Sequence, residues 1–200
     1  MKKVTSLKNV KNIKSLAIKF SLIDGLAPDK KPIKRMLSEM KGMYLDDAKL
    51  DEMLAKQDRI IYEFYNMGMP YDPSELAFGT TILHPGKVGD EYFMTKGHFH
   101  EQLDTAEIYY CTKGHGYLLM ENPEGDVELQ EMTPGVCVYV PPNFAHRSIN
   151  ISDMEPFIMF FVFRADAGHD YKTIETKGFR KLIIEKAGKP EIINNPKWNS

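Results

Sequence analysis

Short stretches of β-forming residues recur along most of this 200-residue chain, and they restrict its fold more than any other feature. Each stretch is rich in β-branched or aromatic residues and ends at turn residues, as at Pro85-Gly86 and Pro134-Gly135. A repeat of about 8–12 residues per strand is typical of an antiparallel sandwich or barrel. The expected strands are 60–65, 78–84, 91–100, 106–111, 116–121, 127–132, 136–140, 145–151 and 157–163, with a hairpin of 182–185 and 191–194 around Gly188. We therefore predict a fold dominated by β-structure.

The first part of the chain is less regular. Residues 14–20 are a further strand candidate, and residues 33–41 show only weak periodicity. One helix is expected after Asp46, which can cap it, because Leu50, Met53 and Leu54 follow at the spacing of one helix face. No linker separates two cores. We predict an N-terminal extension with a short helix, placing the division at residue 45, so that 1–45 pack on the barrel and 46–200 form the β domain.

Composition excludes several classes of partner. With 42% hydrophobic and 27% charged residues the chain has the composition of a soluble globular protein, and its net charge of −2 argues against nucleic acid. No window approaches the roughly 20 apolar residues of a membrane span. The N-terminal segment carries no apolar run of a secretion signal, which favours the cytoplasm. Cys111 and Cys137 are expected to be reduced residues of the core or of strands.

Three histidines and one carboxylate stand where a metal site on strands would place them. His98 and His100 are two residues apart, Glu107 follows after a turn, and His146 follows Pro141-Pro142-Asn143. Side chains two apart on a strand share a face, and neighbouring strand ends of a barrel converge at its mouth. A single histidine is most often a surface or core residue, but this arrangement of four predicts an ion site. Such a set leaves coordination positions open, as catalytic ions require, and suits Fe(II), Mn, Ni, Co or Zn.

The chain resembles one family in particular. Gly135, Pro141, Asn143, His146 and Asn150 fit the second cupin motif, with Asn143 where glycine is usual, and six residues separate His100 from Glu107. The longer spacing, the Thr95-Lys96-Gly97-His98-Phe99-His100 run and the segment 165–171 are similar to the cupin-type phosphoglucose isomerases. The similarity covers most of the chain, from about residue 35 to Trp198.

This resemblance implies a jelly-roll barrel and a cytoplasmic homodimer that interconverts glucose 6-phosphate and fructose 6-phosphate in glycolysis and gluconeogenesis. It implies one divalent metal per subunit, foremost Fe(II), held by His98, His100, Glu107 and His146. It makes Glu107 the candidate base, and it places His169 against the sugar, assisting ring opening or proton movement between O1 and O2. The residues implied to bind the phosphorylated sugar are Tyr62, Thr81, Thr95, Gly97 and Tyr171. Tyr109 shares an inward strand face with Glu107 by the period of two, and so is expected to line the pocket.

Alternatives stay open at this point. The threonines and tyrosines could instead serve strand propensity and core filling, and His169 could be an exposed loop residue. The hydrogen could move by proton abstraction through an enediol or by a hydride shift, because coordination lowers the basicity of Glu107. A metal-dependent cupin oxygenase and a non-catalytic sugar-phosphate-binding cupin are the rival functions. The hydroxyl donors argue against the first, and the complete ligand set argues against the second.

Overall fold

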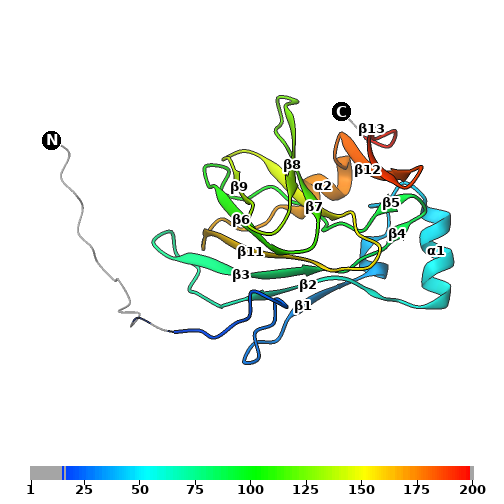
Figure 1. The fold of residues 1–200 in the computed structure, drawn as a ribbon. Helices are drawn as coiled ribbons and strands as arrows, with labels where there is room; N and C mark the ends of the chain where they lie inside the picture. Colours follow the sequence, from blue (N-terminus) through cyan, green and yellow to red (C-terminus); the bar gives the residue numbers. More distant parts are fainter. Residues whose placement is uncertain (1–14, 16, 199–200) are drawn as a thin grey trace.

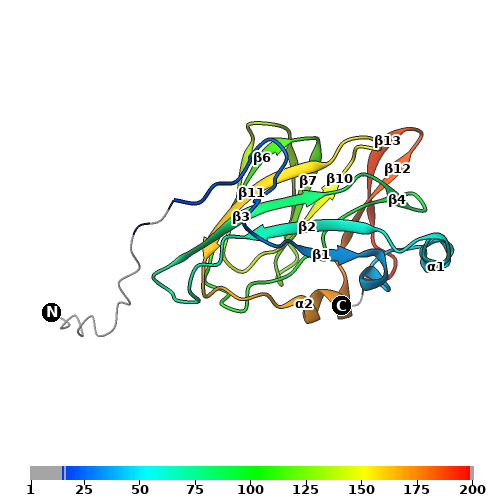
Figure 2. The same ribbon diagram turned by 90° about the horizontal axis from the view of Figure 1, so that it is seen from below.

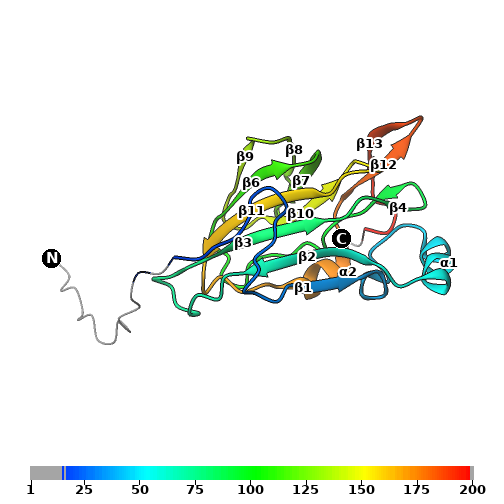
Figure 3. The ribbon, with the colours of Figure 1, turned by 60° about the horizontal axis from the view of Figure 1, so that its bottom comes forward.

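The protein is described by a computed structural model, which places residue 15 and residues 17–198. Its largest sheet has six strands in the order β1-β2-β3-β11-β6-β9 (Figure 1). These strands are β1 (Ile33–Met36), β2 (Ile60–Asn66), β3 (Leu76–Leu83), β6 (Glu107–Lys113), β9 (Cys137–Val140) and β11 (Phe157–Arg164). Figure 3 shows most of them side by side as one long layer. Every strand pair in it is antiparallel, as the turn-separated pattern predicts.

Two smaller sheets complete the barrel. One has the order β10-β7-β8, and the other β13-β12-β5-β4. Their strands are β7 (Gly116–Glu121), β8 (Val127–Met132), β10 (Ala145–Asn150), β4 (Lys87–Val88), β5 (Glu91–Tyr92), β12 (Lys181–Lys186) and β13 (Lys189–Asn194). Figure 2 shows β7 and β10 lying across from the layer of β2 and β3. The predicted β-dominated barrel is confirmed. Within the described residues no helix is long and apolar enough to cross a membrane.

Alternation along the strands decides which side chains face the interior. In β6, Glu107, Tyr109 and Cys111 are buried, whereas Ile108 and Tyr110 are exposed. Because successive strand residues point to opposite faces, this pattern places Glu107 and Tyr109 together inside the barrel, as the sequence predicted. One hydrophobic cluster, which includes Leu118, Met159 and Phe161, fills the interior beside them.

The predicted strand 91–100 is wrong as a continuous element. Only Glu91–Tyr92 form a strand, and isolated bridges follow at Met94 and at His98 and Phe99. Gly97 has φ +75°, which interrupts the extended backbone. The segment still runs beside β10, since the Thr95 N–H donates to the Ser148 carbonyl at 2.9 Å. The side chains of His98 and His100 are therefore positioned by an irregular edge and not by a regular strand.

The N-terminal region differs from prediction in two ways. Position 14 lies outside the described residues, and residues 15 and 17–20 form no strand. Phe20 instead stacks on Phe160, with ring centroids 5.9 Å apart, because its apolar side chain covers the outer face of the sheet. The weakly periodic segment 33–41 forms β1, paired with β2, and a 3-10 helix over Leu37–Met40. The division at residue 45 stays a prediction.

Two helices flank the barrel. The predicted helix is confirmed as α1 (Asp47–Lys56), which Asp46 caps by accepting the Lys49 N–H at 2.8 Å. The second, α2 (Tyr171–Lys177), was not predicted from the sequence. Asp170 caps it through the Thr173 N–H at 3.2 Å. A helix of seven residues has no room for the periodic apolar face by which longer helices are recognised. Its cap and one buried residue, Ile174, hold it in place.

Glu91 carries an unusual carboxyl group in the core. Its side chain is only 3% exposed, and Oε2 accepts the Leu45 N–H at 2.8 Å. Oε1 has no hydrogen-bond partner among the described residues. Burial raises the pKa of Glu91 to about 7, against the opposing effects of the Leu45 N–H and the charge of Arg147.

This pKa predicts how stability depends on pH. The Glu91 carboxyl ionises near 4.5 when unfolded and near 7 when folded, so between these values the folded state holds a proton that the unfolded state has lost. The contribution of Glu91 to stability therefore falls as pH rises through this window, by about 3 kcal/mol at most. Glu91→Gln, which keeps an acceptor for Leu45, should remove this dependence. Urea unfolding at about pH 5 and about pH 8 measures it, and an identical pH response in both proteins would contradict the prediction.

Candidate metal centre and substrate pocket

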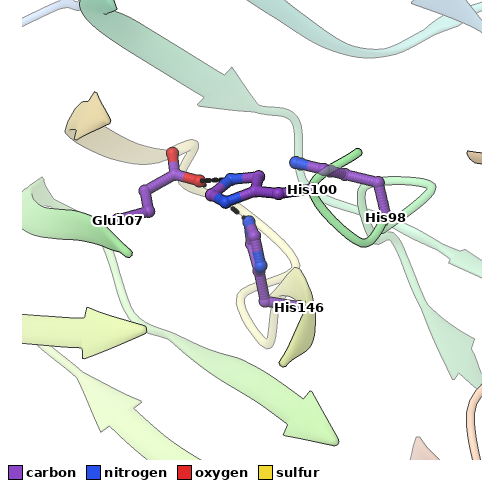
Figure 4. A group of neighbouring side chains, drawn as sticks. All are labelled: His98, His100, Glu107 and His146. Carbon is purple, nitrogen blue, oxygen red and sulfur yellow. Dashed lines mark hydrogen bonds and ion pairs between the residues drawn. The ribbon is translucent and has the colours of Figure 1, made fainter. Parts of the chain in front are cut away.

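The four predicted ligands lie together inside the barrel. His98, His100, Glu107 and His146 are all buried, and each offers one ligand atom within 4.8 Å of the others. The Glu107 Oε2 atom is 3.1 Å from His100 Nε2 and 2.9 Å from His146 Nε2. Figure 4 shows the carboxylate directed at these two rings, with His98 reaching toward them from the segment that also carries His100. The predicted constellation is thus one compact group of three imidazoles and one carboxylate.

Backbone pairing brings these side chains together. His98 and His146 form a two-way bridge, with N–H to carbonyl distances of 3.2 and 3.1 Å. Glu107 opens β6, opposite Val140 on one side and Phe163 on the other. The ligands therefore come from neighbouring edges of the barrel, which is how the sequence places them although the first segment is irregular.

The electrostatics of the group fit a cation. Burial alone would raise the pKa of Glu107, but the His100 and His146 imidazoles beside its carboxylate outweigh this effect and lower the pKa to about 2. Burial, followed by the neighbouring imidazoles, lowers the pKa of His98 well below its ordinary value. Carboxylate and neutral imidazole are the forms that bind divalent metals.

Two buried imidazole nitrogens of the group have no hydrogen-bond partner among the described residues. Among the described residues, His98 Nε2 is buried without a hydrogen-bond partner. His146 Nε2 lies 2.9 Å from Glu107 but also lacks a properly aligned hydrogen bond. A buried polar atom left in this way costs free energy. A divalent cation coordinated by both nitrogens would remove the cost, so the residues present fit a metal.

Thr105 fixes the orientation of one imidazole. Its Oγ1 lies 2.7 Å from His100 Nδ1 and donates to the Gln102 carbonyl at 2.7 Å. Because the hydroxyl hydrogen is used toward Gln102, Oγ1 accepts a hydrogen bond from the Nδ1–H of His100. This assignment leaves His100 Nε2 free of hydrogen and able to coordinate a cation.

Thr105→Val removes this acceptor without a large change in shape. We expect it to weaken metal binding by about 10- to 100-fold, because the His100 Nδ1–H then keeps only its longer contact with the residue-105 carbonyl, at 3.3 Å. Thr105→Ser keeps the hydroxyl and is the matched control. Competition with a chromophoric chelator measures both affinities. Equal affinities in the two variants would show that Thr105 does not orient the ligand.

A pocket opens beside the metal centre and contains the predicted substrate residues. Its lining includes Tyr62, Thr81, Thr95, Gly97, Tyr109, His169 and Tyr171, together with His98, Glu107 and His146. Burial raises the pKa of Tyr171 to about 12 and also raises that of Tyr62. Burial and the nearby Glu107 carboxylate raise the pKa of Tyr109. All three phenols therefore remain protonated donors at neutral pH.

His169 lies inside this pocket and not on an exposed loop. Its ring centroid is 4.4 Å from that of His98, and it stacks on Tyr171 at 5.8 Å. Two backbone hydrogen bonds between Phe99 and Asp170, at 3.2 and 2.8 Å, hold the His169 loop against the ligand segment. Burial lowers the pKa of His169 to about 4, so its imidazole is neutral at physiological pH.

Three motif residues have structural explanations. A Cβ at Gly97 would lie 2.6 Å from the Phe179 ring, so glycine is required by φ and by packing behind the pocket. Asn143 has φ +66°, a conformation that asparagine tolerates better than most residues, which explains how it replaces glycine. Asn150 is fully buried and donates to the Leu83 and Glu155 carbonyls.

Sequence reasoning missed part of the lining. Phe161 and Phe163 point inward from β11, and Asn66 and Ser148 complete the wall. The inward alternation of the predicted strand 157–163 was a usable signal for both phenylalanines. Asn66 and Ser148 carried no such signal, because single polar residues within strands are common. Arg35, whose charge opposes the rise in the pKa of Tyr62, lies in a segment with only weak periodicity.

An antiparallel barrel that encloses three histidines and a glutamate from these motifs defines a cupin. The family described as Glucose-6-phosphate isomerase (GPI) matches residues 34–199. The chain is 46% identical over 185 residues to the glucose-6-phosphate isomerase of Pyrococcus abyssi (strain GE5 / Orsay), covering 92% of this chain and 97% of that protein. The chain belongs to the glucose-6-phosphate isomerase family, and the resemblance seen in its sequence is confirmed.

Relatives extend beyond that genus. The glucose-6-phosphate isomerase of Thermococcus onnurineus (strain NA1) is 45% identical over 185 residues, covering 92% of this chain and 97% of that protein. That of Sinorhizobium medicae (strain WSM419) is 39% identical over 163 residues, covering 80% of this chain and 76% of the other. The family is therefore matched over nearly the whole chain.

Proposed function

We propose that this protein is a metal-dependent isomerase that interconverts glucose 6-phosphate and fructose 6-phosphate, a step of glycolysis and gluconeogenesis. The observation that carries the proposal is that the complete set of four ligands lies at a pocket lined by several hydroxyl donors. The relatives that cover nearly the whole chain are named for this activity. An oxygenase acting on an apolar substrate would have no use for the donors, and a binding protein would not need open metal positions.

Neutral donors suit the phosphate end of the substrate. Tyr62, Thr81, Thr95 and Tyr171 supply hydroxyl groups, and the Gly97 N–H adds a backbone donor. Hydrogen bonds to an anion are stronger than those between neutral groups, so such a set can hold a phosphate without a glycine-rich loop. Tyr109 lines the same pocket beside Glu107 and would contact the sugar.

The metal proposal is one divalent cation per subunit, foremost Fe(II), with Mn, Ni, Co and Zn as alternatives. His98, His100, Glu107 and His146 would hold it. When bound, the cation supplies Lewis acidity toward the oxygens of the open-chain sugar and stabilises negative charge that develops there. The donor set of three nitrogens and one oxygen is compatible with each of these metals.

Glu107 and His169 have different roles in this proposal. The low pKa of Glu107 makes it a weak base, and its Oε2 already faces two imidazoles, which supports a ligand role and a hydride shift between C1 and C2. His169 is neutral, lines the pocket and can accept a proton. It would therefore assist ring opening and carry a proton between O1 and O2.

One experiment tests both the activity and the route. The metal-loaded protein is incubated with fructose 6-phosphate in deuterium oxide, and glucose 6-phosphate is followed by its dehydrogenase and by mass spectrometry. We expect conversion, with little deuterium at C2. No conversion with any divalent metal would contradict the function. Conversion with full deuterium incorporation would keep the function and restore Glu107 as the base.

The proposal includes a homodimer that acts in the cytoplasm. The family resemblance supports both, and the outer face of the large sheet exposes Ile108, Tyr110 and Tyr139, as an interface would. Sedimentation should give twice the chain mass of 23.0 kDa. A monomer at micromolar concentration would contradict the dimer and leave the catalytic proposal unchanged.

A further inference from the structure

A second cavity lies apart from the proposed substrate pocket. It has a volume of about 460 Å³ and lies between residues 42–45, the end of α2 and residues 195–197. The two cavities share no lining residue. A volume of this size is within the range of small-molecule sites. The cavity is therefore large enough to hold a small molecule.

Arg147 from β10 lines this cavity and is the strongest indication of a ligand. Its side chain is 2% exposed, yet among the described residues no carboxylate lies within 4.0 Å of it. One Nη donates to the Lys96 carbonyl at 2.5 Å, the other to the Met94 sulfur at 3.0 Å, and Nε has no partner. The guanidinium carbon lies 4.3 Å from the centre of the Phe179 ring. A guanidinium stays charged at neutral pH, and burying it without a counter-ion is costly.

Two buried acids, Glu91 and Glu121, act on Arg147 through their charge, but among the described residues neither carboxylate lies within 4.0 Å of the guanidinium. Glu91 accepts the Leu45 N–H, and Glu121 accepts the Arg180 N–H at 2.8 Å. Two further acids line the cavity, and both are paired: Asp47 with Lys197 at 2.6 Å, and Glu175 with Lys96 at 2.5 Å.

Lysines add positive charge at the same cavity. Lys177, at the end of α2, lines it, and within the described residues no carboxylate lies within 4.0 Å of Lys177. Lys197 also lines it but is shared by Asp47 and the Tyr44 carbonyl. Three cations against two paired carboxylates leave net positive charge, and the two cations without a carboxylate partner are Arg147 and Lys177.

We propose that this cavity is a second binding site, for a small organic anion whose carboxylate or phosphate group sits on Arg147 and Lys177. The site lies directly behind the ligand segment. A Cβ at Gly97 would be 2.6 Å from Phe179 and 3.0 Å from the Cβ of Arg147, while Gly97 itself lines the substrate pocket. An anion on Arg147 thus binds one residue layer away from His98.

Inorganic phosphate is the probe, titrated into the full-length, zinc-loaded, diamagnetic protein. Sugar phosphates are left out, because their own phosphate group could occupy the proposed site, and the Lys177 variant described below separates this cavity from the substrate pocket. The readout is the side-chain Nε–H resonance of Arg147 in a ¹⁵N-labelled sample, identified by its absence in Arg147→Lys. We expect this resonance to shift and saturate as phosphate is added. A resonance that does not move would overturn the proposal.

A matched pair of charge reversals controls for non-specific attraction of phosphate to the protein and for misfolding. Lys177→Glu changes the cavity, whereas Lys181→Glu makes the same change of net charge outside it, at a lysine whose side chain bonds only to Asn194 within the described part of the chain. We expect Lys177→Glu to weaken phosphate binding by at least about tenfold and Lys181→Glu to leave it unchanged. Equal weakening in both variants would show that phosphate senses only the overall charge, and the site would be rejected.

Discussion

Replacing His146 with alanine should abolish metal binding and isomerase activity together. His146 is 1% exposed, and its Nε2 is 2.9 Å from Glu107, at the centre of the proposed ligand set. Its loss leaves three ligands, and the buried Glu107 carboxylate then keeps only His100 of its two histidine neighbours. Since a Lewis acid contributes several kcal/mol to such a reaction, we expect turnover to fall by at least about 1,000-fold.

The matched control is His115→Ala. His115 is an exposed histidine between β6 and β7 whose side chain, among the described residues, hydrogen-bonds only to Glu131, at 2.6 Å. Metal content by mass spectrometry and activity by the coupled assay are measured for both variants under the same loading conditions. His115→Ala should retain both properties. A His146→Ala protein that folds, lacks metal and still isomerises would refute the metal-dependent mechanism.

Replacing His169 with alanine should separate catalysis from metal binding. His169 lines the pocket but is not one of the four ligands. We expect turnover to fall by about 100- to 10,000-fold, the usual contribution of a general acid–base group, with metal content unchanged. Substrate affinity should change little, because the phosphate donors are untouched.

His169→Gln provides the comparison for His169→Ala. It keeps a polar side chain of similar reach without an imidazole, so it should be as impaired as the alanine variant if proton transfer is the role. Recovery of activity in His169→Gln would indicate positioning by hydrogen bonding. Unchanged turnover in both variants would remove His169 from the mechanism.

The parts of the fold that follow period-two alternation could be predicted from sequence. The inward positions of Glu107 and Tyr109 are an example, because β6 is a regular strand with one buried face. The helix α1 was equally clear, since Asp46 and a periodic apolar face mark its start. The ligand set could be predicted because four residues of suitable chemistry recur at strand ends.

The remaining parts depend on contacts that local sequence does not reveal. The segment around Gly97 looked like a strand, but positive φ and packing against Phe179 and Arg147 bend it. The inward position of His169 depends on backbone pairing between Phe99 and Asp170, which are 71 positions apart in the sequence. Residues 33–36 form a strand because β2 offers a free edge, and not because their own pattern is strong.

The most direct test of the account is the activity of the chelated protein after single divalent metals are added back. We expect the stripped protein to be inactive toward fructose 6-phosphate. Activity should return in proportion to the metal bound, reaching its maximum at one ion per chain. Full activity in a protein shown by mass spectrometry to hold no metal would contradict the central claim, as would an ion located away from His98, His100, Glu107 and His146.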